Sequence, residues 1–198
     1  MGLLTHRPGV AARRRTAWIL TVCTALFVAG AARPATAEVN PLATAIKASY
    51  LYKMAPFVDW PAGAFPTPTS PFVLCVVGRD PFGPLLDRAV SGQSVSGRPI
   101  VVDRLDQISR NSPCQIAFLA GSATQSMPQA LLALRGAPVL TITDDAAAPG
   151  IVDFTVAGDR VRFRIDDEAA AENGLTISSK LLSLALKVNP RKASDIDR

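Results

Sequence analysis

The segment Phe72–Val77 (FVLCVV) constrains the fold more than any other part of the sequence. All of its residues are apolar, so it lacks the alternation that marks a strand with one side facing solvent. A continuous apolar run of this length is typical of a strand that is covered on both faces, as in parallel sheets. We therefore expect helices on both sides of a sheet that contains this strand.

Short strand and helix patterns alternate after this run. The predicted strands are Pro99–Val102, Ile116–Leu119 and Val139–Ile142, and the predicted helices are one that ends at Val90 and one at Pro128–Leu134. Alternation at this spacing favours βαβ units. We predict a single α/β domain whose sheet is mixed, mostly parallel and flanked by helices.

The segment before the first strand has the pattern of an amphipathic helix. Asn40 and Pro41 are typical of a helix start, as the cap residue and the first helical residue. Pro56 should end or kink the helix. The apolar residues predicted to form one buried stripe are Leu42, Ile46, Tyr50, Met54 and Phe57.

From Ile151 onward the pattern of apolar and polar residues differs from that of the preceding strands. Ile151–Val156 and Val161–Ile165 alternate apolar and polar residues, which predicts a β-hairpin. Asp166 can cap a short helix that Gly174 ends. A last apolar stripe predicts a final amphipathic helix and consists of Ile177, Leu181, Leu184 and Ala185. We place the domain at residues 38–189 and expect the polar residues 190–198 to form a disordered tail.

Residues 1–37 have the composition of a secretory signal peptide. They contain five arginines and no acid, an apolar run at Ala17–Ala32, and the small-x-small pattern of Ala35 to Ala37. Without them the chain has 16 basic and 16 acidic residues, so the basic pI gives no reason to expect nucleic-acid binding. We expect Sec-type export to a bacterial periplasm, with a retained membrane anchor as the alternative.

The exported part offers no catalytic constellation. Its lack of histidine, since His6 lies in the leader, excludes a Ser-His-Asp triad, a Cys-His pair and a histidine-ligated metal. Gly78-x4-Gly83 lacks the Lys and Ser or Thr of a phosphate loop. Asp144-Asp145 and Ser178-Ser179-Lys180 complete no known motif. We predict no catalytic residues, no cofactor, no metal and no enzyme activity.

A row of arginines on the second hairpin strand has two interpretations. Arg160, Arg162 and Arg164 alternate with apolar residues, so they share the solvent face of the hairpin. They form either a solvated face or a basic docking edge for an acidic partner.

Cys75 and Cys114 are the only cysteines outside the leader. Cys75 lies in the first parallel strand and Cys114 lies at the start of the third. In a flavodoxin-like strand order these two strands are neighbours about 4.8 Å apart, which is compatible with a disulfide. We predict a Cys75–Cys114 disulfide, with two buried thiols as the alternative.

Seven segments, taken in order, resemble the YfiR-like periplasmic regulators. The resemblance spans about residues 46–185, and its most specific parts are the run from Lys47 to Pro61 and the run Ile177–Leu182. The segments are IKASYLYKMAPFVDWP (46–61), PFVLCVVGRDPFG (71–83), GRPIVV (97–102), VLTITD (139–144), GIVDF (150–154), VRFRI (161–165) and GLTISSKLLSLA (174–185). The chain departs from the family at Pro56, and it lacks the second cysteine pair that some members carry near the hairpin.

This resemblance implies a function without catalysis. It implies a protein, commonly dimeric, that binds the periplasmic domain of an inner-membrane diguanylate cyclase and represses it, which lowers cyclic di-GMP and biofilm formation. We expect the partner contacts near Trp60 and around Lys180. A periplasmic sensor of a small ligand, a nucleotide or an amino acid, stays open as the alternative. Such a ligand would use the crevice past Gly78, Gly121 and Asp144.

The leader gives a direct prediction. Cleavage after Ala37 should leave Glu38 as the first residue of the exported protein, which N-terminal sequencing of periplasmic material measures. Recovery of protein that still carries residues 1–33 would contradict cleavage and favour the membrane anchor.

Overall fold

The strand β2 (Phe72–Gly78) lies inside the sheet, with a parallel neighbour on each side. These neighbours are β4 (Arg98–Leu105) and β5 (Ile116–Gly121). The full order is β10-β8-β7-β6-β5-β2-β4-β3. The other strands are β3 (Ser94–Val95), β6 (Leu140–Thr143), β7 (Val152–Ala157), β8 (Arg160–Asp166) and β10 (Lys187–Asn189). Within this sheet only β3–β4 and β7–β8 pair antiparallel, so the predicted mixed, mostly parallel sheet is confirmed.

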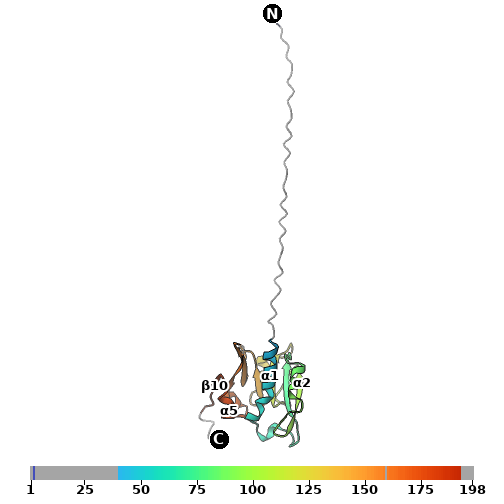
Figure 1. The fold of residues 1–198 in the computed structure, drawn as a ribbon, viewed down its shortest axis with the longest axis vertical. Helices are drawn as coiled ribbons and strands as arrows, with labels where there is room; N and C mark the ends of the chain where they lie inside the picture. Colours follow the sequence, from blue (N-terminus) through green and yellow to red (C-terminus); the bar gives the residue numbers. More distant parts are fainter. Residues whose placement is uncertain (1, 3–39, 159, 193–198) are drawn as a thin grey trace. The chain divides into compact units, whose positions relative to one another are not determined.

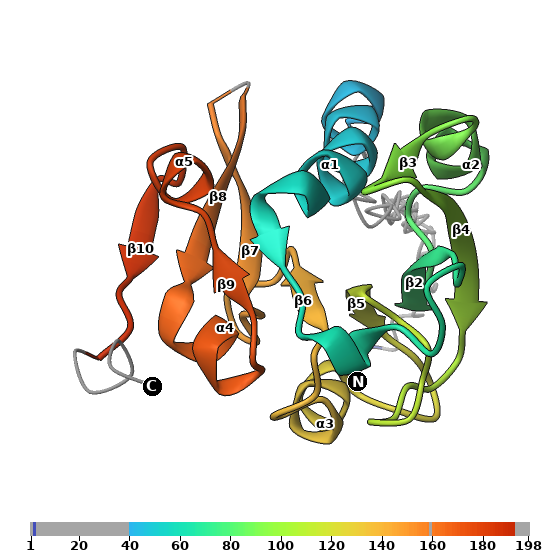
Figure 2. The same ribbon diagram turned by 90° about the horizontal axis from the view of Figure 1, so that it is seen from below.

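The structure is a computed structural model that describes residue 2, residues 40–158 and residues 160–192. The predicted signal peptide and residues 193–198 of the predicted tail lie outside these residues. Figure 1 shows the domain, and Figure 2 shows that its sheet curls around α1 (Pro41–Lys53). Among the described residues, no helix is long and apolar enough to cross a membrane.

Helices cover both faces of β2, as its sequence predicts. Phe72, Leu74 and Val76 belong to the larger core, together with buried residues of α1 and of α2 (Pro84–Val90). Cys75 and Val77 point to the other face, where the smaller core includes residues of α3 (Met127–Ala133). The absence of polar residues in the run therefore follows from burial on both sides.

Helix α1 begins and ends where the sequence predicts, but its buried stripe differs. The Asn40 side chain accepts hydrogen bonds from the N–H groups of Leu42 and Ala43. The fully buried residues of α1 are Thr44, Ala48 and Leu51, whereas the side chain of Leu42 is 66% exposed. A spacing of four residues rotates about 40° per step around a helix, so the predicted stripe winds away from one face. The helix then gives way to η1 (Ala55–Phe57), which contains Pro56.

Two glycines meet at the ends of β2 and β5. Gly78 has a φ of +86°, and a Cβ atom there would lie 2.0 Å from the carbonyl oxygen of Gly121. Only glycine permits this approach, in which the Arg79 N–H donates to that oxygen at 3.1 Å. The first glycine of Gly78-x4-Gly83 is therefore explained by strand packing.

The C-terminal segment contains the predicted hairpin and a shorter final helix than predicted. Helix α4 (Asp167–Glu172) has Asp166 as its cap, and α5 (Ser179–Leu182) has Ser178. Ile177 is not helical, because it belongs to β9 (Thr176–Ile177), which pairs with β1 (Val58–Asp59) in a second, antiparallel sheet. The chain leaves α5 to pair β10 with β8, so the side chain of Leu184 stays 63% exposed.

The predicted disulfide is present in the structure. Cys75 and Cys114 are bonded with their Cα atoms 5.8 Å apart, and both residues are buried. β2 and β5 are adjacent, which is the strand order that the prediction required. The bond fastens the start of β5 to the middle of β2 across the smaller core.

Removal of the disulfide should destabilise the domain strongly. It closes a loop of 39 residues, so the double variant Cys75→Ala/Cys114→Ala should lose about 4 kcal/mol of unfolding free energy through loop entropy. Urea unfolding measures this difference, and the intact mass of the wild-type protein should be lower by two hydrogens without reductant. Free alkylation of both thiols after unfolding would contradict the bond.

Candidate functional site

Trp60, one of the two residues predicted to contact a partner, is fastened to the sheet. It follows β1, is half-buried, and donates from its indole N–H to the carbonyl oxygen of Gln115 at 3.2 Å. Its ring packs edge-on against Phe72, with the ring centroids 5.2 Å apart. A cavity of about 210 Å³ beside it is lined in part by Phe65 and Arg98. The position of the indole is therefore set by both a hydrogen bond and an aromatic contact.

Gln115 holds this region together and was not singled out by the sequence. Its side-chain oxygen accepts from the Val73 N–H at 2.8 Å, and its side-chain nitrogen donates to the Ala64 carbonyl at 2.7 Å. Its main-chain oxygen also accepts from the Leu140 N–H at 2.9 Å. Ala64 ends η2 (Ala62–Ala64), so one buried amide joins the segment after Trp60 to the sheet. A single glutamine between Cys114 and Ile116 belongs to no motif that would have revealed this role.

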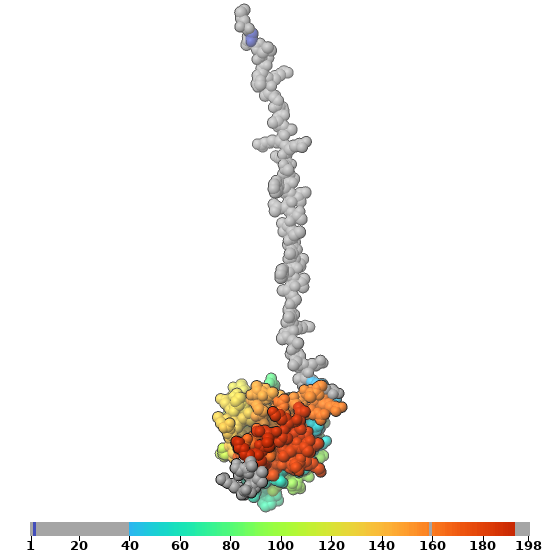
Figure 3. All heavy atoms as spheres, turned by 90° about the vertical axis from the view of Figure 1, so that its left-hand side faces the viewer, coloured from blue at the N-terminus to red at the C-terminus, as the bar shows by residue number. Residues whose placement is uncertain are grey.

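Lys180, the second predicted contact residue, is exposed on α5. The antiparallel register pairs Val58 with Ile177 and Asp59 with Thr176, so Trp60 and Lys180 follow opposite ends of the β1–β9 sheet. The structure thus places both residues beside one two-stranded sheet without bringing them together. Figure 3 shows that the C-terminal elements, in orange to red, form a continuous part of the surface.

The arginine row lies on the solvent face of β8, as predicted. Arg160, Arg162 and Arg164 are exposed, whereas the apolar residues between them are buried. Arg164 is 3.6 Å from a carboxylate oxygen of Asp153 on β7, the residue opposite it in the register. The row is therefore partly neutralised by an acid on the adjacent strand.

Asp153 is an acid with an unusual environment. Its side chain is buried, and its Oδ2 atom accepts no hydrogen bond within the described part of the chain. Burial raises the pKa of Asp153 and outweighs the opposing effects of Arg164 and of the Thr143 hydroxyl. The nearby carboxylates of Asp144 and Asp145 raise this pKa further.

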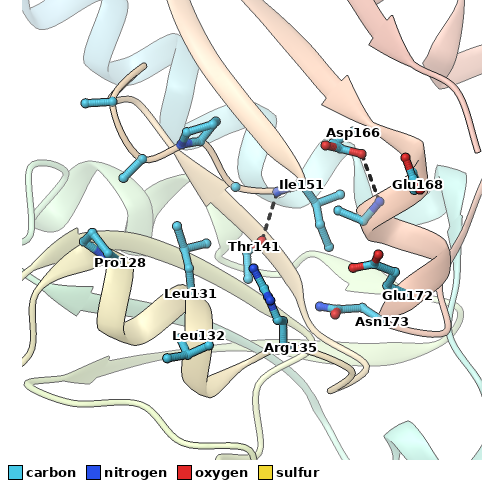
Figure 4. A pocket seen from close by; sticks show the side chains of 15 residues that line it. Pro128, Leu131, Leu132, Arg135, Thr141, Ile151, Asp166, Glu168, Glu172 and Asn173 are labelled. Carbon is cyan, nitrogen blue, oxygen red and sulfur yellow. Dashed lines mark hydrogen bonds between the residues drawn. The ribbon is translucent and has the colours of Figure 1, made fainter.

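A cavity of about 670 Å³ lies between α3 and α4 (Figure 4). One wall is the apolar side of α3, with Pro128, Leu131 and Leu132. The α4 side carries Glu168 and Glu172. Thr141 lies between the walls and accepts from the Ile151 N–H at 3.0 Å. The residues of this cavity are dispersed in the sequence, which explains why no pattern predicted it.

A third cavity, of about 290 Å³, lies at the crevice that the sequence assigns to a small ligand in the alternative function. It is lined by Arg79 after β2, by Ala120 of β5 and by Asp144 after β6. Lys47 of α1 closes one side through an ion pair with Asp144, at 3.0 Å. The glycines Gly78 and Gly121 shape the adjacent strand ends.

The remaining sequence candidates have structural roles. Ser178 caps α5 by accepting from the Leu181 N–H at 3.4 Å. Asp145 accepts from the Ala147 N–H at 2.9 Å and so shapes the turn after β6. The described residues contain no group of three or more His, Cys, Asp or Glu side chains arranged to hold a metal ion.

These features define a disulfide-linked, mixed α/β domain with at least three surface cavities and a two-stranded sheet that carries Trp60 at one end. The profile of the YfiR/HmsC-like family matches residues 44–186, and the chain belongs to this family. YfiR-like proteins are periplasmic and are known as regulators of diguanylate cyclases, with a regulatory rather than a catalytic role. Among curated proteins no match to the chain was found.

Asp153 should make the stability of the domain depend on pH. Because its folded pKa lies above its unfolded value, near 3.9, the folded state holds the proton more tightly. The contribution of this group is therefore largest at low pH and is lost as the pH rises through the folded pKa. Asp153→Asn cannot ionise, so the stability of the wild type relative to this variant should fall as the pH rises above the unfolded pKa of an aspartate and through the raised folded pKa.

Urea unfolding of both proteins at a series of pH values measures this difference. The comparison of two proteins cancels the titration of the other carboxylates. A difference that stays constant, or that grows in favour of the wild type as the pH rises, would contradict the raised pKa.

Proposed function

We propose that this protein is exported to the periplasm, binds the periplasmic domain of an inner-membrane diguanylate cyclase and represses it. The observation that supports this most strongly is the match to the YfiR/HmsC-like family over residues 44–186. The periplasmic location is supported by residues 1–37, whose composition is that of a signal peptide for export. In this proposal the protein lowers cellular cyclic di-GMP and biofilm formation.

Trp60 suits the docking surface because its segment is already ordered. Its indole is hydrogen-bonded to Gln115, and η2 is bonded to the same residue through Ala64. An interface that is rigid before binding loses less conformational entropy when the complex forms. The exposed residues next to Trp60, from Pro61 to Gly63, would then meet the cyclase without rearrangement.

Lys180 supplies a charge at the other end of the β1–β9 sheet. Exposed charges at the rim of an interface guide association and select the partner more than they add to affinity. We infer that the cyclase surface opposite Lys180 carries acidic side chains.

Repression requires a difference in affinity between two states of the cyclase. A protein that bound the active and the inactive conformation equally would change nothing, however tightly it bound. In this proposal the surface that includes Trp60 and Lys180 fits the inactive conformation better.

The proposal includes a homodimer. Leu184 and Leu186, which precede the edge strand β10, are 63% and 58% exposed. Apolar side chains beside an unpaired sheet edge are suited to burial against a second copy. Sedimentation of the purified protein tests the dimer separately from the cyclase interaction.

Deletion of the gene tests the function. We expect a several-fold rise in cellular cyclic di-GMP and more biofilm, and re-expression with residues 1–37 should reverse both. Re-expression of Lys180→Glu should restore repression poorly, because a reversed charge meets like charge across the interface and weakens binding by about tenfold or more. Arg88→Glu, an exposed charge reversal on α2, is the matched control and should restore repression fully.

Two results would contradict the proposal. The first is unchanged cyclic di-GMP in the deletion strain together with no cyclase recovered by cross-linking. The second is equal loss of repression by Lys180→Glu and Arg88→Glu, which would remove Lys180 from the contact surface.

A further inference from the structure

The cavity at the ends of β2, β5 and β6 has the position of a ligand site. In sheets built from βαβ units, ligands bind beyond the carboxyl ends of the strands. Here residues at the carboxyl ends of three neighbouring strands line one cavity of about 290 Å³: Arg79 after β2, Ala120 near the end of β5 and Asp144 after β6. Thr44 and Lys47 of α1 form another side.

Part of the lining is apolar and well packed. Phe82 and Phe118 are buried and contact each other edge-on, with ring centroids 4.7 Å apart. Ala120 and Met127 complete this part of the lining. The cavity can therefore accept a short apolar group as well as polar atoms.

The charged groups are of both signs and are only partly paired. Lys47 and Asp144 neutralise each other at 3.0 Å, with side chains 16% and 33% exposed. Arg79 forms no ion pair within residues 40–158 and 160–192. Asp145 uses one oxygen for the Ala147 N–H, and its other oxygen has no hydrogen bond among the described residues. One cation and one anion are thus left for a ligand.

The turn after β2, which contributes Arg79 and Phe82 to the cavity, is unsuited to binding a phosphate group. The N–H groups of Phe82 and Gly83 would be the donors to an anion, but both already donate to Asp80 Oδ1, at 2.7 and 3.0 Å. Burial raises the pKa of Asp80, but the hydrogen bonds from Arg104 and from these two N–H groups outweigh it and lower the pKa. The carboxylate of Asp80 therefore occupies the place that a nucleotide phosphate would need.

We propose that this cavity binds a small zwitterion, a free α-amino acid with a short apolar side chain. The carboxylate of the ligand would pair with Arg79, its ammonium group with Asp145, and its apolar side chain would lie over Phe82 and Phe118. The volume lies at the lower limit of ligand pockets, about 300 Å³, and so suits an amino acid. This site is independent of the proposed cyclase contacts at Trp60 and Lys180.

Calorimetric titration of the purified protein with L-valine, L-leucine and L-methionine tests the site. We expect at least one to bind with a Kd of about 1 mM or tighter and to raise the Tm at higher ligand concentration. For leucine, 4-methylpentanoate lacks the ammonium group and 3-methylbutylamine lacks the carboxylate. Each should bind at least about tenfold more weakly than the amino acid, because each leaves one protein charge without its partner.

Variants locate the binding. Arg79→Gln and Asp145→Asn should each weaken binding by about tenfold or more, and both keep the fold, because both side chains are exposed and asparagine can still accept from Ala147. Arg135→Gln and Glu172→Gln, in the cavity between α3 and α4, are the matched controls and should leave the Kd unchanged.

Three results would overturn the proposal. One is the absence of heat and of any Tm change with all three amino acids at about 10 mM. Another is equal affinity for leucine and for either analogue, which would show that the protein does not bind the charged group that the analogue lacks. The third is an unchanged Kd in Arg79→Gln and Asp145→Asn.

Discussion

The hydrogen bonds of Gln115 are the interaction on which the rest of the candidate docking surface depends. This buried residue joins β2 through Val73, β6 through Leu140, η2 through Ala64, and the indole of Trp60. A buried donor or acceptor left without a partner costs about 1–3 kcal/mol. The polar atoms of Gln115 are therefore satisfied only when Trp60, η2 and the sheet stand in this one arrangement. The position of Trp60 on the surface follows from the interior of the protein.

The disulfide and the hydrogen bonds that fix this region belong to two consecutive residues, Cys114 and Gln115. Cys114 is bonded to Cys75 in the middle of β2, and Gln115 begins the contacts to Trp60 and η2. The start of β5 is thereby fixed to β2 on one face of the sheet and to the Trp60 segment on the other. This arrangement gives a regulator of the YfiR/HmsC-like family a rigid surface at Trp60, whose ring also packs on Phe72 of the larger core.

The sequence predicts the parts of this fold that depend on local patterns. The apolar run at Phe72–Val77 indicated a sheet covered on both faces, and a flavodoxin-like strand order, in which the first and third strands are neighbours, led to the disulfide. The β1–β9 sheet was missed because strands of two residues have no periodicity and pair across most of the chain. Gln115 and the cavity between α3 and α4 were missed because they depend on residues that only the tertiary structure brings together. The contact roles of Trp60 and Lys180 stay predictions.

The central claim is that this protein represses a diguanylate cyclase by direct binding, and reconstitution tests it most directly. The purified cyclase in proteoliposomes should synthesise cyclic di-GMP at a rate that falls as the exported protein is added to the side that carries the periplasmic domain. The decrease should saturate, because it reflects binding to one conformation of the cyclase. A synthesis rate that stays unchanged when the added protein greatly exceeds the cyclase would contradict the account.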